Sequence, residues 1–147
     1  MKLTNTQNVK SKSGMTLLEL TVVILVLLSL ISILFIGARA WKKGSDRAAN
    51  ILNVRNVQQA VRAHANVRGL DTPDDVGDGV ALPVAQIIGT GLYLNAVKPP
   101  LASVEEYEYT ETVPAVGEIY ISNAALTAID GEYFYSADEL AAKTGDW

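Results

Sequence analysis

One carboxylate stands in an otherwise uncharged apolar run, and its position points to a chemical role. Residues 15–38 carry a single charged side chain, Glu19, near the start of the run. An acid inside an apolar segment costs free energy, so a simple membrane anchor gains nothing from it. A carboxylate in a low-dielectric layer is stabilised by a paired cation. We therefore expect Glu19 to have a positively charged partner with a functional purpose.

A new α-amino group is a cation that the neighbouring residues could supply. If the chain were cut between Gly14 and Met15, Met15 would carry an amine that is normally protonated near neutral pH. This terminal amine does not necessarily reach Glu19 along one helix, so we expect the pair to form between two chains. Such a contact would fix the axial register of two packed helices and would serve assembly.

The element that positions Glu19 is the apolar run itself. Its 24 residues, 15–38, would extend about 36 Å as a helix, and a bilayer core is about 30 Å thick. The run is apolar on all sides, as in a transmembrane helix. It is longer than the apolar core of a secretory signal peptide, which usually has about 7–15 residues. A plain single-pass anchor remains open, because basic residues flank the run on both sides and the positive-inside count is a tie.

The residues around this acid carry a family resemblance. The sequence Ser13-Gly14-Met15-Thr16-Leu17-Leu18-Glu19-Leu20 resembles the processing site of type IV prepilins and type II secretion pseudopilins. The specific resemblance covers residues 10–38. It implies a leader of residues 1–14, cleavage after Gly14 by a prepilin peptidase, N-methylation of Met15 and a requirement for Glu19 when a subunit enters a filament.

The resemblance also implies a function, a location and a set of partners. The function is that of a structural subunit in a type IV pilus-like or type II secretion pseudopilus filament, the latter serving protein secretion. The protein would cross the cytoplasmic (inner) membrane once, with its head outside the cytoplasm, and would end in a periplasmic or surface filament. Its partners would be the prepilin peptidase/methyltransferase, itself and other pilin-like subunits, the inner-membrane assembly platform and membrane lipid.

The sequence departs from the family pattern in three places. Met15 stands where phenylalanine is most frequent, and no proline interrupts the apolar run, where Gly37 is the only helix-loosening residue late in the segment. The absence of cysteine excludes the C-terminal disulfide of many major pilins and shifts weight towards a pseudopilin or a simpler pilin. An alternative from another class is a monomeric, single-pass, membrane-anchored periplasmic binding module. That protein would keep its N-terminus uncut and would not depend on Glu19.

Composition excludes several kinds of site. The chain has no cysteine and one histidine, His64, which rules out disulfides, thiolate metal sites and two-histidine metal sites. No motif implies a metal ion or another cofactor. Residues 69–147 hold fourteen acids and two basic residues, a balance that disfavours binding to nucleic-acid phosphates. Glu106 and Glu108 share a predicted strand face, but no cleft or second motif accompanies them, so we predict that the protein is not an enzyme.

Residues 39–68 are predicted to continue the helix as an amphipathic stem. Apolar residues recur there at three- and four-residue steps and form one stripe: Ile51, Val54, Val57, Val61 and Ala65. Polar residues are assigned to the opposite positions: Arg47, Arg55, Gln58, Gln59 and Arg62. We expect the stripe to pack on the head's sheet, the polar face to meet solvent or neighbouring subunits, and His64 to be a partly exposed helix residue.

Residues 69–147 are predicted to form a small, acidic, β-rich head. Gly69 stands where a glycine commonly ends a helix. The alternation in residues 106–111 and the return at residues 118–121 predict two strands, with Tyr107 and Tyr109 facing the core. Together with the helix, this gives an α+β fold, in which a long N-terminal helix with a transmembrane half and an amphipathic half packs on a small antiparallel sheet of three or four strands.

Later signals complete the head. Residues 129–132 predict a two-residue hairpin that leads into a strand at residues 133–135. Ser136 and Glu139 predict a capping box for a short terminal helix, closed by Gly145. Residues 71–79 hold four acids among glycines, which invites a calcium-site interpretation. The segment lacks the EF-hand spacing, and such clusters are ordinary turn material, so we favour a turn.

Overall fold

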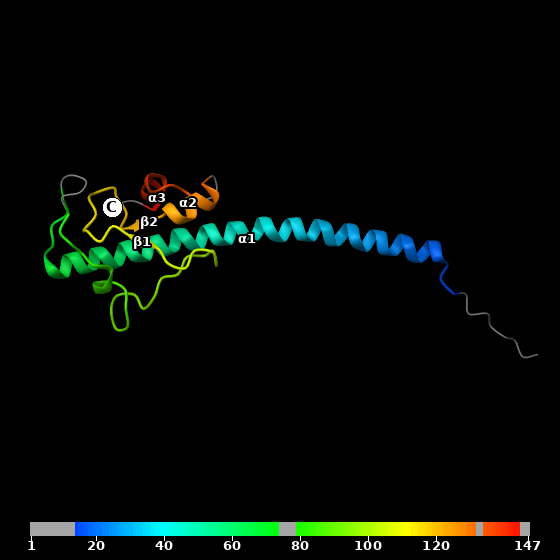
Figure 1. Ribbon diagram of the computed structural model, residues 1–147, viewed down its shortest axis with the longest axis horizontal. Helices are drawn as coiled ribbons and strands as arrows, with labels where there is room; N and C mark the ends of the chain where they lie inside the picture. The colour runs from blue at the N-terminus through cyan, green and yellow to red at the C-terminus, as the bar shows by residue number, and fades with distance from the viewer. Residues whose placement is uncertain (1–13, 74–78, 132–133, 145–147) are drawn as a thin grey trace, which may run out of the picture. The chain divides into compact units, whose positions relative to one another are not determined.

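The computed structural model describes residues 14–73, 79–131 and 134–144 (Figure 1). It divides into two compact units, residues 1–40 and 41–147, and each is described by itself. The elements, in chain order, are α1 (Leu17–Arg68), the 3₁₀ helix η1 (Val84–Gln86), β1 (Glu108–Tyr109), β2 (Ile121–Ser122), α2 (Ala124–Asp130) and α3 (Ala137–Thr144). The predicted α+β class, with a long N-terminal helix and a small antiparallel sheet, is confirmed.

In the first unit, α1 has no buried face. Every side chain from residue 14 to residue 40 is exposed. The hydroxyls of Thr21, Ser29 and Ser32 donate to the carbonyl oxygens of the preceding turn at 2.7–2.8 Å. Because these groups are satisfied within the helix, the only large surface that the helix offers here is apolar. This part of α1 is long and apolar enough to span a membrane.

In the second unit, the same helix buries the predicted stripe. Val54, Val57, Val61 and Ala65 are buried, and Ile51 packs against the edge of the core. The helix ends at Arg68 because Gly69 adopts a positive φ of 66°, and the amide of Leu70 donates to the carbonyl of Ala65 at 2.9 Å. The predicted glycine stop is therefore confirmed.

The core of the second unit is formed by this stripe and by large apolar side chains from the rest of the chain. Those that are fully buried are Leu82, Ile87, Tyr120, Ile121, Leu126 and Leu140. Tyr107 is buried and Tyr109 is half-buried, whereas Glu106 and Glu108 are exposed, which confirms the predicted faces. Several loops and both short helices contribute to this core, so it depends on the helix stripe more than on a sheet.

The sheet is smaller than the sequence predicts. In the part of the chain that the structure describes, β1 and β2 form a two-stranded antiparallel sheet in which Glu108 pairs with Ser122 and Tyr109 with Ile121. An isolated antiparallel bridge joins Ala81 to Thr112, and a parallel one joins Ile88 to Leu94. The prediction of three or four strands is thus wrong for the described residues.

A side chain from α1 takes the place of a further strand. Gln58 accepts a hydrogen bond from the amide of Tyr120 at 3.0 Å and donates to the carbonyl of Glu118 at 3.1 Å. These two backbone groups would otherwise need a neighbouring strand. The side chain is only 3% exposed, so its assignment to the polar, outward face is wrong.

His64 is also placed differently from the prediction. Its side chain is 5% exposed and meets the ring of Tyr93 edge-on, with ring centroids 5.6 Å apart. His64 is three residues after Val61, so helical spacing brings it to the border of the buried stripe. The loop that carries Tyr93 then covers it, which local periodicity does not reveal.

The predicted hairpin at residues 129–132 is wrong where the structure describes it. Residues 124–130 form helix α2, and Asp130 at its end accepts a salt bridge from Lys43 at 3.0 Å. The alanine-rich sequence of α2 favours a helix over a strand. Residues 132 and 133 lie outside the described residues, as do residues 74–78 of the acidic turn and Gly145. The Ser136 capping box is confirmed, because the amide and hydroxyl of Ser136 donate to Glu139 at 3.0 and 3.1 Å.

Candidate functional site

The residues predicted for processing lie at the start of the described chain. Gly14 and Met15 precede the first residue of α1, and both are exposed, Met15 by 69%. An added Cβ at Gly14 would meet nothing within 4 Å. Among the described residues, the space around Gly14 is therefore open to an added Cβ.

Glu19 and Thr16 form a reciprocal capping box at the start of α1. The amide and hydroxyl of Thr16 donate to the Glu19 carboxylate at 2.8 and 3.0 Å, and the amide of Glu19 donates to the Thr16 hydroxyl at 3.2 Å. This is the arrangement in which a threonine and an acid three residues later satisfy the free amides of a helix start. The carboxylate is thereby fixed in the first turn, where the helix dipole favours negative charge.

Thr16 is the residue that the sequence analysis missed. Its hydroxyl caps the helix start, whereas the hydroxyl of Thr21 bonds back to the preceding turn. The signal was present, because threonine followed three residues later by glutamate before an apolar run is a known start pattern. The structure therefore brings Thr16 and Glu19 together, and Met15 directly precedes Thr16 in the sequence.

The arrangement has a defined chemical capacity. The Glu19 side chain is exposed, and a carboxylate oxygen can accept more than one hydrogen bond. It can therefore keep its contacts with Thr16 and still receive a cation from outside the chain. Around it, Leu17, Leu18 and their successors form an apolar surface of a kind that marks a membrane or protein contact.

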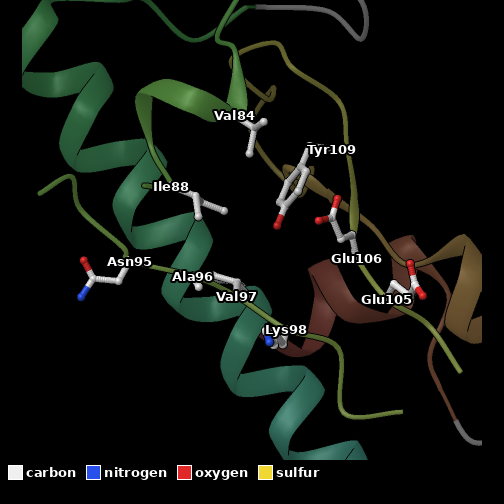
Figure 2. A pocket seen from close by; sticks show the side chains of 9 residues that line it. All are labelled: Val84, Ile88, Asn95, Ala96, Val97, Lys98, Glu105, Glu106 and Tyr109. Atoms are coloured by element: carbon white, nitrogen blue, oxygen red, sulfur yellow. The ribbon is translucent and has the colours of Figure 1, made fainter. Parts of the chain in front are cut away.

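A separate hollow lies on the second unit (Figure 2). Its volume is 270 Å³, below the range of about 300–1,000 Å³ that is typical of small-molecule sites. Its walls combine apolar, aromatic and charged side chains, namely those of Val84, Ile88, Asn95, Ala96, Val97, Lys98, Glu105, Glu106 and Tyr109. One tyrosine and one glutamate that were predicted for opposite faces of a strand, Tyr109 and Glu106, thus both line this hollow.

The tyrosines of this unit have perturbed acidities that reflect packing. Burial raises the pKa of Tyr107 and of Tyr120 from 10.0 to about 12. Burial, and the nearby Glu106 carboxylate, raise the pKa of Tyr109. A phenol that holds its proton more tightly is a weaker acid, so even less of the phenolate is present at neutral pH. These shifts therefore mark tyrosines that are held neutral inside the core.

Comparison with known proteins adds no relative. No family model matches the chain, and no curated protein and no solved structure matches it.

Proposed function

We propose that this protein is a filament subunit of the type IV pilus or type II secretion pseudopilus kind. In this proposal a peptidase cuts after Gly14, Met15 is N-methylated, and the processed chain assembles through the first part of α1. The observation that carries the proposal is the Gly14 to Glu19 segment, where an accessible cleavage position precedes a carboxylate fixed in the first turn of an exposed apolar helix.

The proposed assembly contact joins Glu19 of one subunit to the Met15 amine of a neighbour. Thr16 supports this contact because its two hydrogen bonds to the carboxylate hold Glu19 in one position. In a membrane, lipid already surrounds the apolar side chains, so the hydrophobic effect does not drive helices together. Helix association then depends on packing and on polar contacts of this type. The Glu19 pair would set the axial register, and the apolar residues that follow would pack between subunits.

Replacing Gly14 tests the processing step. Gly14→Leu is expected to leave the leader attached, which intact mass spectrometry of the membrane-extracted protein would detect. Because an added Cβ at Gly14 meets nothing within 4 Å, loss of cleavage would reflect recognition and not misfolding. Gly37→Leu is the matched control, since its surroundings are equally open, and it should be cleaved normally. Normal cleavage of Gly14→Leu would contradict the proposal.

Replacing Glu19 tests the assembly step and separates charge from capping. Glu19→Gln keeps an oxygen that can accept from Thr16 and removes the charge, whereas Glu19→Ala removes both. We expect both variants to insert and to be cleaved, yet to yield at least tenfold fewer filaments by electron microscopy and shear-fraction immunoblotting. Wild-type assembly by Glu19→Gln would show that capping, and not pairing with an amine, is what the carboxylate provides.

A further inference from the structure

We infer that the hollow in Figure 2 receives the side chain of Arg55 from a second copy of this chain. This inference rests on the proposed function, because it names a contact between copies in the filament. It concerns residues far from the segment that the processing and Glu19 contact use.

The hollow has the chemistry of an arginine site. Figure 2 shows the carboxylate of Glu106 and the ring of Tyr109 turned toward the same space, with Val84 and Ile88 along one wall. A guanidinium binds carboxylates through paired hydrogen bonds and packs on aromatic faces. The apolar wall suits the methylene stem of the same side chain. At 270 Å³ the hollow fits one long side chain better than a larger ligand.

The walls of the hollow are tied to α1. The side-chain amide of Asn53 donates to the carbonyl of Lys98 at 2.8 Å and to the hydroxyl of Tyr107 at 3.2 Å. The Tyr107 hydroxyl in turn donates to Asn50 at 2.7 Å. Tyr107 directly follows Glu106, so these bonds fix the chain on both sides of the hollow. The site is therefore formed before any partner arrives.

Arg55 is an exposed basic side chain of α1 in the same unit as the hollow. It is exposed, and the helix positions three and four residues away hold Ile51, Leu52, Gln58 and Gln59, so α1 supplies it with no acidic neighbour. By contrast, the guanidinium of Arg47 stacks on Tyr135, with its carbon 3.9 Å from the ring centroid. Lys43 is held by Asp130.

The positions of Arg55 and the hollow on one copy predict a head-to-tail contact. Asn53 marks the side of α1 on which the hollow is attached. Arg55 follows two residues later, which is about 200° around a helix of about 3.6 residues per turn. A copy thus presents its arginine on one side and its hollow on nearly the opposite side. Such a head-to-tail contact forms an open filament when the rotation between successive copies does not close into a ring.

Cross-linking tests the contact without altering it. The natural chain has no cysteine, so Gln59→Cys, one turn from Arg55, and Ala96→Cys, in the wall of the hollow, would be the only thiols. In membranes of cells that express the full chain, a short bismaleimide should link this double variant into a ladder of dimers, trimers and larger species. The control pair Gln59→Cys with Asp138→Cys places the second thiol on α3, outside the hollow, and should give no ladder.

Charge changes then assign the ladder to the inferred pair. Adding Arg55→Glu should reduce it to the level of the control, and adding Glu106→Arg to that variant should restore it. Lys98→Gln should strengthen the ladder, because it removes a positive charge from the wall. The inference would be overturned if Arg55→Glu left the ladder unchanged. It would also be overturned if the Gln59→Cys and Ala96→Cys pair gave a ladder no stronger than that of the control pair.

Filaments are scored in the same cells, so the two proposals can fail separately. Filaments without a ladder would overturn the Arg55 contact alone. A ladder without filaments would overturn the filament role and keep the contact between copies.

Discussion

The two parts of helix α1 use apolar residues in different ways. Up to residue 40 every side chain is exposed, and the apolar ones surround the helix. From Asn50 to Ala65 the helix is one-sided, with a buried stripe and buried polar side chains that bond to the rest of the unit. The apolar side chains of the first part are not buried within its own unit, which suits a segment that enters a membrane. Those of the stripe in the second part are buried within its own unit.

The largest expected effect comes from placing a charge in the one-sided part. Val57 is 0% exposed, so Val57→Asp would bury an unpaired acid and should lower the free energy of unfolding by about 4 kcal/mol or more. Near-ultraviolet circular dichroism of the detergent-solubilised full chain during urea unfolding would measure it. Leu52→Asp, on the exposed side of the same helix, is the control and should change stability by about 0.5 kcal/mol or less. Equal losses would show that α1 has no buried face here.

Gln58 offers a sharper test, because its neighbour in sequence faces the other way. Gln58→Ala leaves the amide of Tyr120 and the carbonyl of Glu118 without a partner, which should cost about 2–4 kcal/mol. Gln59→Ala, at an exposed position, should be nearly neutral. Urea unfolding of both variants would measure the difference. If the two substitutions had the same effect, Gln58 could not be replacing a strand.

The buried tyrosines predict a loss of stability at alkaline pH. The pKa values of Tyr107 and Tyr120 rise from 10.0 to about 12 in the folded chain. Between these values the unfolded chain loses protons that the folded chain keeps, so the free energy of unfolding falls as pH rises from 10 to about 12. Below pH 10 both states keep the proton and these groups contribute no pH dependence. Urea unfolding at stepwise pH would check this, and Tyr107→Phe should flatten the decline.

The smallest effects compare two capping boxes of the same chemistry. Ser136→Ala should destabilise the second unit by about 1 kcal/mol, because the cap of α3 is part of its fold. Thr16→Ala removes the matching bonds at the start of α1 and should leave the melting of the second unit unchanged. A shift of that melting transition with Thr16→Ala would mean that the two parts of α1 unfold together.

The sequence predicted what local rules control. The glycine stop at Gly69, the apolar stripe and the Ser136 capping box depend on neighbours within about four residues. Gln58 and His64 were assigned by residue type, although Gln58 is four residues after Val54 and three before Val61, within the stripe by spacing. What covers these side chains comes from distant segments, and periodicity contains no such information.

The strands show the same limit. β1 and β2 have only two residues each. The hydrogen bonds that a longer sheet would make come in part from Gln58 and from two isolated bridges, and α2 contributes to the packing. At the candidate site, Gly14, Met15 and Glu19 were identified from the sequence motif, and Thr16 was missed although its spacing from Glu19 fits a capping box. The amine partner proposed for Glu19 belongs to another chain, which no single fold can contain.

Intact mass and N-terminal sequencing of the membrane-extracted protein test the central proposal most directly. We expect a chain that begins at Met15 and is one methyl group heavier than its formula. A chain that begins at Met1 would contradict the proposal and favour a plain membrane anchor. A chain that begins near Trp41 would contradict it in another way, because the helix that carries Glu19 would then have been removed.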